Sequence, residues 1–366
     1  MEHETSRRKM EHLKLCSECH VESKQASAGF EDVILVHRAL PEISMGQIDM
    51  SVDFFGKQLA FPFLIASITG GHPETTAINA ALAGAAEKMG IGIGVGSQRA
   101  AIDDPNQIAS FKIVREKAPN AFVYANIGAA QISNYGVERV NQLVSMIDAD
   151  AIAVHLNFLQ EAIQPEGDRD ATRCLDMIET ICSASSVPVI AKETGAGISR
   201  KDALLLKKAG VSAIDVGGVG GTSWAGVEVY HSRQENDSLC AHLGELFWDF
   251  GLPTVSSLVE CKVGVSLIAT GGVRTGLDVA KSIAIGASVG SAALPFVNAA
   301  FEGQKAVENA LYVISQELKA TMFLTGCSNI HALAQSPAVI VGKTYDYLTR
   351  RGFNVSGDAH KEIDDL

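Results

Sequence analysis

The chain has 366 residues, of which 47% are hydrophobic and 20% are charged, and its formal net charge is −12. This apolar content is enough for a large core, which excludes disorder as the main state. The acidic charge repels nucleic-acid backbones and anionic membrane surfaces, so we expect neither as a partner. The length suits either about two domains or one α/β barrel.

The N-terminal segment and the cysteines point to a cytoplasmic protein. Residues 1–12, MEHETSRRKMEH, are charged and contain no apolar stretch of the kind that a secretory signal needs. The seven cysteines are odd in number and scattered, which fits reduced thiols better than a disulfide framework. Cys16 and Cys19 form a C-x-x-C pair near His12 and His20, but no second ligand pair follows. We therefore favour an amphipathic helix over a zinc site here.

Two short apolar runs follow, Val33–Leu40 and Met50–Gly56. We expect them to pair as a hairpin that plugs one end of the barrel predicted for the residues from 61 onward.

From residue 61 onward one unit repeats: a short apolar run, a polar or glycine ending, and a helical stretch. Such runs are typical of strands buried on both faces, and their alternation with helices predicts a parallel sheet. Eight units indicate a closed (β/α)8 TIM barrel. The alternative is an open doubly wound sheet, but its G-x-G-x-x-G signature is absent after the early strands. The eight runs are Phe61–Ser67, Ile91–Gly96, Phe122–Ile127, Ala151–Asn157, Val187–Lys192, Ala213–Gly217, Leu267–Thr270 and Ala287–Ser291.

Helices are expected between these runs, at residues 75–89, 137–147, 173–183, 200–209 and 276–285, with a long final helix at 302–325. The uncharged stretch 282–301 is about as long as a membrane span. Gly286, Gly290 and Pro295 interrupt it, so we interpret it as a helix end, a strand and a loop. We expect one domain, with an N-terminal segment and hairpin (1–60) that caps the substrate, the barrel (61–353) and a polar tail (354–366).

Polar residues follow each predicted strand. In TIM barrels the active site lies at the C-terminal ends of the strands. A single polar residue there is more simply a cap or a turn residue, but eight strand ends in succession indicate a site. They include Ser67, Thr69, Ser97, Gln98, Arg99, Asn126, His155, Asn157, Lys192, Thr222 and Arg274.

The stretch after the seventh strand, ATGGVRTG at residues 269–276, is suited to a phosphate. Its glycines let backbone N–H groups approach an anion, Arg274 adds positive charge, and Thr275 can cap a following helix. Lys192 and Asn126 then favour FMN, with the lysine at the anionic edge of a reduced flavin. Pyridoxal phosphate with Lys192 as the Schiff-base lysine, and a plain sugar-phosphate enzyme, remain alternatives.

A second anionic site is suggested by positive residues without evident carboxylate partners in the sequence. They are Arg7, Arg8 and Lys9 with His12, and Arg99 after the second strand. Glu161 follows His155 closely and offers a hard oxygen ligand suited to Mg²⁺ on a phosphate or diphosphate.

These stretches resemble one family. The matching segments are RRKMEH (7–12), GFEDVILVHRALPE (29–42), ITGG (68–71), VGSQR (95–99), HLNFLQE (155–161), PEGDR (165–169), VPVIAKETGAG (187–197), DVGGVGGTSW (215–224) and TGGVRTGLDVAKSIAIGA (270–287). The chain resembles the type 2 isopentenyl diphosphate isomerases, which are FMN-dependent (β/α)8 barrels. The resemblance implies a 1,3-allylic proton shift from isopentenyl to dimethylallyl diphosphate in isoprenoid biosynthesis. It also implies reduced FMN, Mg²⁺, NADPH as reductant, and a homo-oligomer, tetrameric or octameric.

The resemblance further implies roles for individual residues. Substrate would be held by Arg8, Lys9, His12, Ser97, Gln98, Arg99, Asn157 and Gln160, and Mg²⁺ by Glu161. FMN would be held by Ser67, Ile68, Thr69, Ser97, Asn126, Lys192, Thr222, Gly271, Gly272, Val273, Arg274, Ala293 and Leu294. Ile68 departs from the methionine common in the family, at a backbone contact where little chemistry is at stake.

The candidate catalytic residues are His155, Gln160 and Glu228. The resemblance suggests that the reduced flavin, near N5, moves the proton. Glu228 as a protein acid or base is an alternative, and its simpler interpretation is a surface helix carboxylate.

Two other function classes agree less well with the sequence. An FMN-dependent 2-hydroxy-acid oxidase needs a base beyond the seventh strand, usually histidine, and ATGGVRTG contains none. A non-catalytic flavin- or phosphate-binding scaffold gives no reason for His155, Gln160 and Glu161 to accompany the N-terminal Arg/Lys pair.

Overall fold

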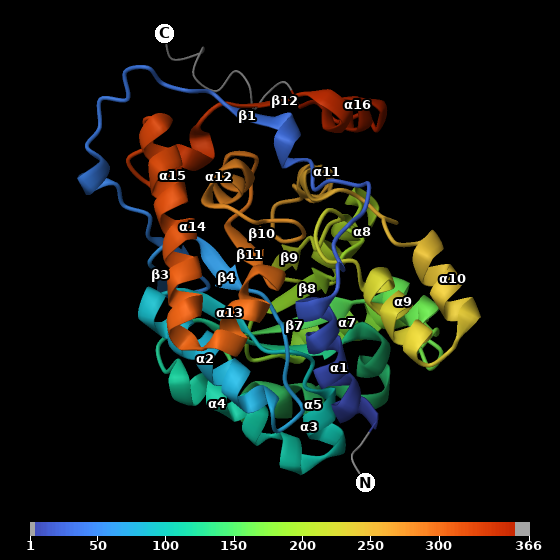
Figure 1. Ribbon diagram of the computed structural model, residues 1–366. Coiled ribbons are helices and arrows are strands. Elements are labelled where there is room, and N and C mark those ends of the chain that lie inside the picture. Colours follow the sequence, from blue (N-terminus) through green and yellow to red (C-terminus); the bar gives the residue numbers. More distant parts are fainter. Residues whose placement is uncertain (1–3, 356–366) are drawn as a thin grey trace.

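A closed barrel of eight parallel strands forms the centre of the computed structural model, which describes residues 4–355 of the chain (Figure 1). The side chains of residues 4–8, 133 and 134 lie outside that description. The strands follow one another around the barrel in chain order, and the last pairs with the first. They are β4 (Phe63–Ile65), β5 (Gly92–Gly94), β6 (Val123–Gly128), β7 (Ala151–Leu156), β8 (Val189–Glu193), β9 (Ala213–Asp215), β10 (Ser266–Ala269) and β11 (Val289–Ala292). The prediction of a closed barrel is confirmed, and the alternative of an open sheet is wrong.

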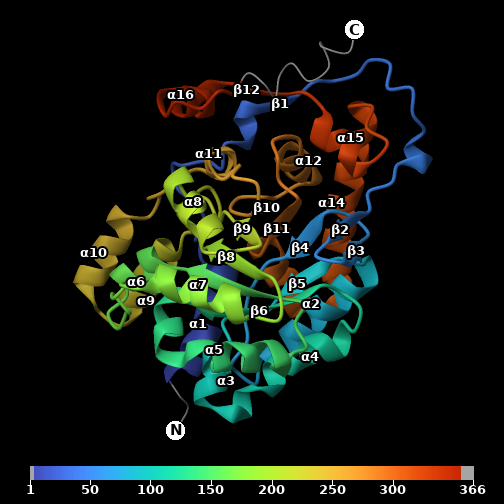
Figure 2. The ribbon, with the colours of Figure 1, turned by 180° about the vertical axis from the view of Figure 1, so that it is seen from behind.

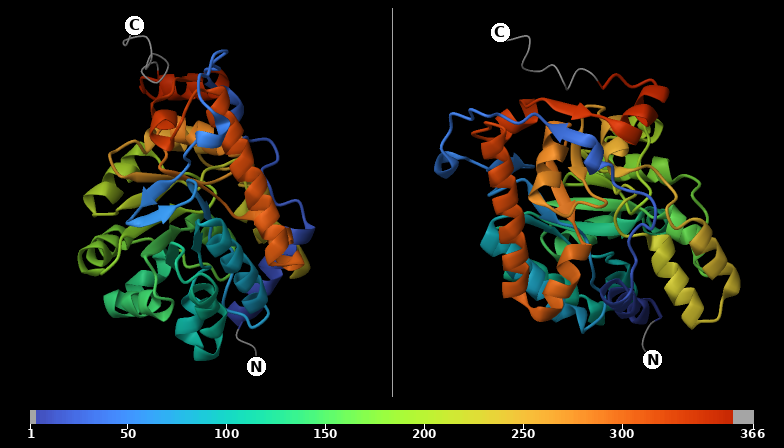
Figure 3. Two further views of the ribbon diagram at one scale, coloured as in Figure 1. Left: turned by 90° about the vertical axis from the view of Figure 1, so that its left-hand side faces the viewer. Right: turned by 45° about the horizontal axis from the view of Figure 1, so that its top comes forward.

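Helices surround the barrel (Figures 1 and 2). The five helices predicted between strands are present as α2 (Thr75–Met89), α5 (Ala129–Met146), α7 (Cys174–Ala184), α8 (Arg200–Lys208) and α12 (Gly276–Ala284). The long final helix is α14 (Gln304–Leu324), which runs along one side of the barrel (Figure 3). The remaining barrel helices are α3 (Arg99–Asp103), α4 (Ala109–Lys117), α6 (Phe158–Ile163), α9 (Trp224–Gln234), α10 (Ser238–Leu246), α11 (Thr254–Glu260), α13 (Val297–Glu302) and α15 (Ile330–Gln335).

The predicted pairing of Val33–Leu40 with Met50–Gly56 is wrong. Instead β2 (Val52–Phe54) pairs with β3 (Lys57–Leu59) through a turn at Phe55–Gly56, both of which have positive φ. Two adjacent positive φ values are typical of the tight hairpin turn that matches strand twist. Phe54 and Leu59 are buried against the residues inside the barrel, so a hairpin does plug one end, but a later one than expected.

The other predicted strand pairs across the whole length of the chain. β1 (Val33–Leu35) lies antiparallel to β12 (Ala338–Ile340), next to α16 (Gly342–Arg350). No local sequence signal links segments some three hundred residues apart; strand pairing and the burial of Val33 beside Ile340 join them in the folded protein. The predicted division into 1–60, 61–353 and 354–366 stays a prediction, and residues 356–366 lie outside the described part.

The barrel interior changes from apolar to polar along the strands. At the hairpin end it is filled by Leu64, Tyr124, Ala151, Ile190 and Ala213. Further along the same strands, at alternate positions, come Asn126, His155, Lys192 and Asp215. Because alternate residues of a strand share a face, these polar groups also point inward, toward the C-terminal mouth.

The N-terminal helix α1 (Glu4–Glu18) lies over that mouth (Figure 3). Leu15 and Val21 pack against Val227 of α9, which anchors the helix to the barrel. Within residues 4–355, no helix combines the length and apolar character that crossing a membrane requires.

Candidate active site

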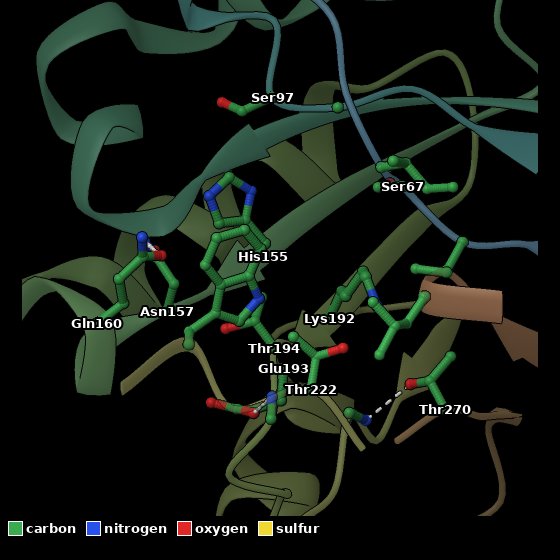
Figure 4. Close-up of a pocket in the computed structure, with 18 of the residues that line it drawn as sticks. Ser67, Ser97, His155, Asn157, Gln160, Lys192, Glu193, Thr194, Thr222 and Thr270 are labelled. Atoms are coloured by element: carbon green, nitrogen blue, oxygen red, sulfur yellow. Dashed lines mark hydrogen bonds between the residues drawn. The ribbon is translucent and has the colours of Figure 1, made fainter. Parts of the chain in front are cut away.

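A cavity of about 460 Å³ lies between the C-terminal mouth of the barrel and α1. This volume falls in the range of small-molecule and cofactor sites. Side chains from several strand ends point into it, with Asn157 and Gln160 on one side and Thr270 on the other (Figure 4). Lys9 and His12 of α1 line its outer wall.

Strand register explains why three charged or titratable residues lie side by side, two of them lining this cavity and the third directly behind its wall. His155 of β7 is the register partner of Lys192 of β8, and Lys192 is the partner of Asp215 of β9. In-register neighbours on parallel strands project side by side, so the three side chains form one row inside the barrel.

His155 is a neutral hydrogen-bond acceptor toward the cavity. The Asn126 amide Nδ2 donates to the Val95 carbonyl (3.1 Å), which leaves its oxygen Oδ1 facing Nδ1 of His155 at 2.8 Å. Nδ1 must therefore carry the proton, and Nε2 is left as the acceptor. Burial, helped by the charges of Lys9 and Lys192, lowers the pKa of His155 to about 3. The imidazole thus stays uncharged near neutral pH.

Glu161 presents a carboxylate held by neutral donors alone. Oε1 accepts from Asn157 Nδ2 (3.0 Å) and Gln131 Nε2 (3.5 Å). Oε2 accepts from Gln164 Nε2 (2.6 Å) and the backbone N–H of Asp168 (2.8 Å). Among residues 4–355 these partners include no cation, so the carboxylate contributes negative charge to the cavity wall.

Glu228 lies behind the cavity and is fully buried on α9. Gln160 Nε2 donates to its Oε1 at 2.7 Å, and Nε2 of His12 lies 3.6 Å from the same oxygen. The His12 ring also meets Trp224 edge-on, with centroids 5.4 Å apart. The interpretation of Glu228 as a surface carboxylate is therefore wrong.

Lys192 forms a buried ion pair at the cavity floor. Its Nζ donates to Oδ2 of Asp215 at 2.8 Å, and Thr270 Oγ1 donates to Oδ1 of the same carboxylate. Next to this pair, burial raises the pKa of Glu193 to about 7, although backbone N–H groups after β8 hydrogen-bond its carboxylate.

The loops after β10 and β11 form a positively polarised end of the cavity. Gly271 and Gly272 have φ values of +94° and +74°, a region that favours glycine. Among residues 4–355, the backbone N–H groups of Gly272, Val273, Ala293 and Leu294 meet no acceptor. Arg274 adds a guanidinium there, which pairs through Nε with Glu22 at 3.0 Å.

Most residues predicted for the site line this one cavity. They are Lys9, His12, Ser67, Ile68, Ser97, Arg99, Asn126, His155, Asn157, Gln160, Glu161, Lys192, Thr222, Gly271, Gly272, Val273, Arg274, Ala293 and Leu294. Glu228, Thr69 and Gln98 lie behind the wall. The Gln98 amide instead donates to the Leu143 carbonyl and accepts from the Asn126 backbone. The side chain of Arg8 is outside the described part.

One expectation about partners needs correction. Arg99 and His12 belong to the positive residues without evident carboxylate partners in the sequence, but Arg99 lies 3.7 Å from Asp103 on its own helix and His12 lies 3.6 Å from Glu228. Further residues at or next to the cavity were not predicted: Glu22, Gln131, Gln164, Asp215, Trp224 and Thr270. An acidic residue inside an apolar strand was the available signal for Asp215, whereas Glu22 gave none because its partner lies 252 residues away.

The chain is similar to known proteins along most of its length. The family model described as FMN-dependent dehydrogenase matches residues 1–155 and 154–340. An isopentenyl-diphosphate delta-isomerase of Methanosarcina acetivorans is 69% identical over 351 residues, covering 96% of each chain. Another from Archaeoglobus fulgidus is 57% identical over 348 residues, covering 95% of this chain and 99% of the relative.

Solved structures share the fold at low identity. A lactate oxidase of Pediococcus acidilactici matches with a TM-score of 0.64 and 15% identity, covering 91% of this chain and 94% of the other. A mandelate oxidase variant with an FMN adduct matches with a TM-score of 0.59 and 19% identity, covering 87% and 94%. These likenesses concern the barrel fold alone.

Proposed function

The chain belongs to the FMN-dependent dehydrogenase family and, within it, to the isopentenyl-diphosphate delta-isomerases, and we propose that its cavity holds reduced FMN, Mg²⁺ and isopentenyl diphosphate together. One observation carries the proposal. A single cavity joins the anion-binding end after β10 and β11, the carboxylate of Glu161 and the cationic face of α1.

The residues present fit FMN. The unmatched N–H groups after β10 and β11, with Arg274, suit a phosphate. Ser291 offers a further argument, because its buried hydroxyl lines the cavity without a partner within residues 4–355. Lys192 at the floor would face the electron-rich edge of the flavin.

Glu161 fits Mg²⁺. Its carboxylate faces the cavity with neutral donors only, and hard oxygen ligands are what Mg²⁺ prefers. Its partners fix its orientation, as groups around a metal ligand commonly do. The ion would neutralise the diphosphate and hold it on this side of the cavity.

The cationic and polar groups near α1 would position the substrate. Lys9 and His12 from α1 and Ser97 and Arg99 after β5 line the outer part of the cavity, where a diphosphate is attracted. We propose that Arg8 assists them. Positioning of this kind lowers the activation barrier, because the substrate is already oriented before the chemical step.

Moving a proton on an alkene demands a strong and well-placed acid, because an unactivated alkene is a very weak base. When bound, reduced FMN would supply the group that donates and removes the proton. His155 is unsuited to donate, because its Nε2 bears no proton and its pKa is far below neutrality. We propose that it accepts a hydrogen bond instead.

Gln160 and Glu228 act as a unit. The Gln160 amide donates to the buried carboxylate, and the amide oxygen accepts from Asn157 Nδ2 at 3.4 Å. We propose that Gln160 contacts the substrate and that Glu228 orients it. Glu228 as the acid or base stays the alternative, and it would have to work through Gln160 or His12, since it does not itself line the cavity.

The cellular setting belongs to the proposal. NADPH would reduce the flavin, and the seven free cysteines support a cytoplasmic location. A homo-oligomer, tetrameric or octameric, is supported by large exposed apolar side chains on α14, among them Tyr312, Val313 and Leu324.

The 2-hydroxy-acid oxidase alternative is not favoured. The lactate and mandelate oxidases share the fold at under 20% identity. The loop after β10 also lacks the histidine that such an oxidase needs as base.

The proposal is tested with purified protein, isopentenyl diphosphate, Mg²⁺, FMN and NADPH under anaerobic conditions. We expect dimethylallyl diphosphate to form, and to depend on both FMN reduction and Mg²⁺. Tight FMN binding without any dimethylallyl product would overturn it.

A further inference from the structure

Asp215 is a buried carboxylate that the reaction outlined above does not use. It lies on β9, in register with Lys192, and only 1% of its surface is exposed. It does not line the cavity, whereas Lys192 does. Its charge therefore lies directly behind the ammonium that faces the cavity.

Both oxygens of Asp215 are held in defined positions. Oδ2 accepts from Lys192 Nζ at 2.8 Å, within a pair whose side chains are 10% and 2% exposed. Oδ1 accepts from the Thr270 hydroxyl. That hydroxyl itself accepts the backbone N–H of Gly217 at 2.9 Å, so its own proton is left for the carboxylate. Donation therefore converges on Asp215, from Gly217 through Thr270 on one side and from Lys192 on the other.

This arrangement has an electrostatic consequence for whatever binds against Lys192. A buried ammonium needs a counter-charge, which Asp215 supplies. The same counter-charge cancels part of the positive potential that the ammonium projects into the cavity. A ligand that gains negative charge there is stabilised less than it would be by the lysine alone.

We propose that Asp215 is a positioning residue for Lys192 that holds the ammonium in place and lowers the reduction potential of the bound flavin. The proposal rests on the proposed function, in which FMN lies against Lys192. Two-electron reduction to the anionic flavin adds negative charge beside the pair, and the carboxylate opposes that gain. Asp215 thereby keeps the reduced cofactor a strong reductant although a lysine faces it.

The test measures the midpoint potential of bound FMN in the full-length holoprotein at pH 6.5, about four units below the ordinary lysine pKa. In Asp215→Asn the amide oxygen still accepts from Thr270, but the charge is gone. We expect the potential to rise, with the preference for reduced over oxidised FMN growing by about tenfold at an effective dielectric constant near 20. Lys192→Met should move the potential in the opposite direction.

Opposite signs are the decisive signature, because general loosening of the site would not produce them. Asp215→Ser removes the same charge with a smaller side chain, so it reads out the effect if the asparagine variant folds poorly. A potential that is unchanged or lowered in both variants, with FMN still bound, overturns the proposal. Loss of FMN from both variants, with wild-type circular dichroism, also overturns the proposal, because Asp215 would then be needed for the shape of the cavity and not for the reduction potential of the flavin.

The outcome is separable from that of the proposed function. A wild-type protein without FMN affinity would overturn both. If the wild-type enzyme binds FMN and isomerises its substrate, but the midpoint potential of the flavin does not change when Asp215 is replaced, this inference alone is overturned.

Discussion

Asn126 determines which nitrogen of His155 carries the proton. Its amide nitrogen donates to the Val95 carbonyl, so its oxygen faces His155 and accepts from Nδ1 at 2.8 Å. The imidazole is thereby held in one tautomer, with Nε2 directed to accept from groups in the cavity. The pair converts a residue that is usually a proton carrier into a fixed acceptor.

The first prediction concerns Asn126→Asp. A carboxylate opposite Nδ1 favours the charged imidazolium and raises the pKa of His155 from about 3 by one unit or more. The wild-type rate of isomerisation should show no His155 titration between pH 5 and 8. The variant's rate should gain an acidic limb and fall as His155 becomes protonated.

The matched control is the double variant Asn126→Asp with His155→Gln, whose pH–rate profile should lack the new limb. Persistence of that limb without His155 would assign it to another group and contradict the prediction.

The second prediction concerns Glu161→Gln. The change keeps the shape of the side chain and removes the charge that faces the cavity with neutral partners only. The Mg²⁺ concentration for half-maximal activity should rise roughly tenfold or more, while the flavin absorbance of the holoprotein stays unchanged. Glu179→Gln, the same change at an exposed site on α7, should leave both at wild-type values. Flavin loss from the Glu161 variant would show that the residue belongs to the flavin site instead.

The third prediction distinguishes binding of the FMN phosphate from binding of the flavin ring. Arg274→Ala should weaken FMN about tenfold or more, because it removes a charged hydrogen-bond donor from the phosphate end. Riboflavin, which lacks the phosphate, should bind the variant and the wild type alike. Arg233→Ala, on the exposed face of α9, serves as the control. Equal losses for FMN and riboflavin would place the phosphate elsewhere.

The fourth prediction concerns the joint between α11 and α16. Glu260 is buried, and although burial opposes it, hydrogen bonds from Arg351, the Arg200 N–H and Tyr347 lower its pKa. Arg351→Ala should lower Tm by roughly 2–4 °C at pH 7. Lys305→Ala, which removes an exposed ion pair with Glu308, should change Tm by about 1 °C or less.

The pH dependence of this joint follows from the sign of the shift. A carboxyl whose pKa is depressed on folding stabilises the protein above its unfolded value of about 4.3, and this contribution is lost as pH falls through the folded value. The difference in Tm between wild type and Arg351→Ala should therefore shrink below about pH 4.5. A difference that grows on acidification would contradict the assignment.

Local patterns in the sequence predicted the barrel correctly. Each βα unit can be recognised within some thirty residues, from an apolar run, a glycine or polar ending and a helical stretch. The bounds of α2, for example, agree with the predicted range of 75–89. The hairpin was misplaced because Val33–Leu35 has a strand-like sequence, yet its partner Ala338–Ile340 lies at the far end of the chain. Apolar runs reveal strand propensity, but not which distant strand supplies the pairing.

The sequence by itself determined the fold class, the strand ends that carry polar groups and the family of the chain, because these depend on short-range periodicity and on motifs. Tertiary structure alone decided the partners of those groups. Register across β7, β8 and β9 set His155, Lys192 and Asp215 side by side, and packing of α9 buried Glu228 behind Gln160. Charge, tautomer and pKa depend on neighbours within a few ångströms, and in a barrel those neighbours come from strands far apart in the chain.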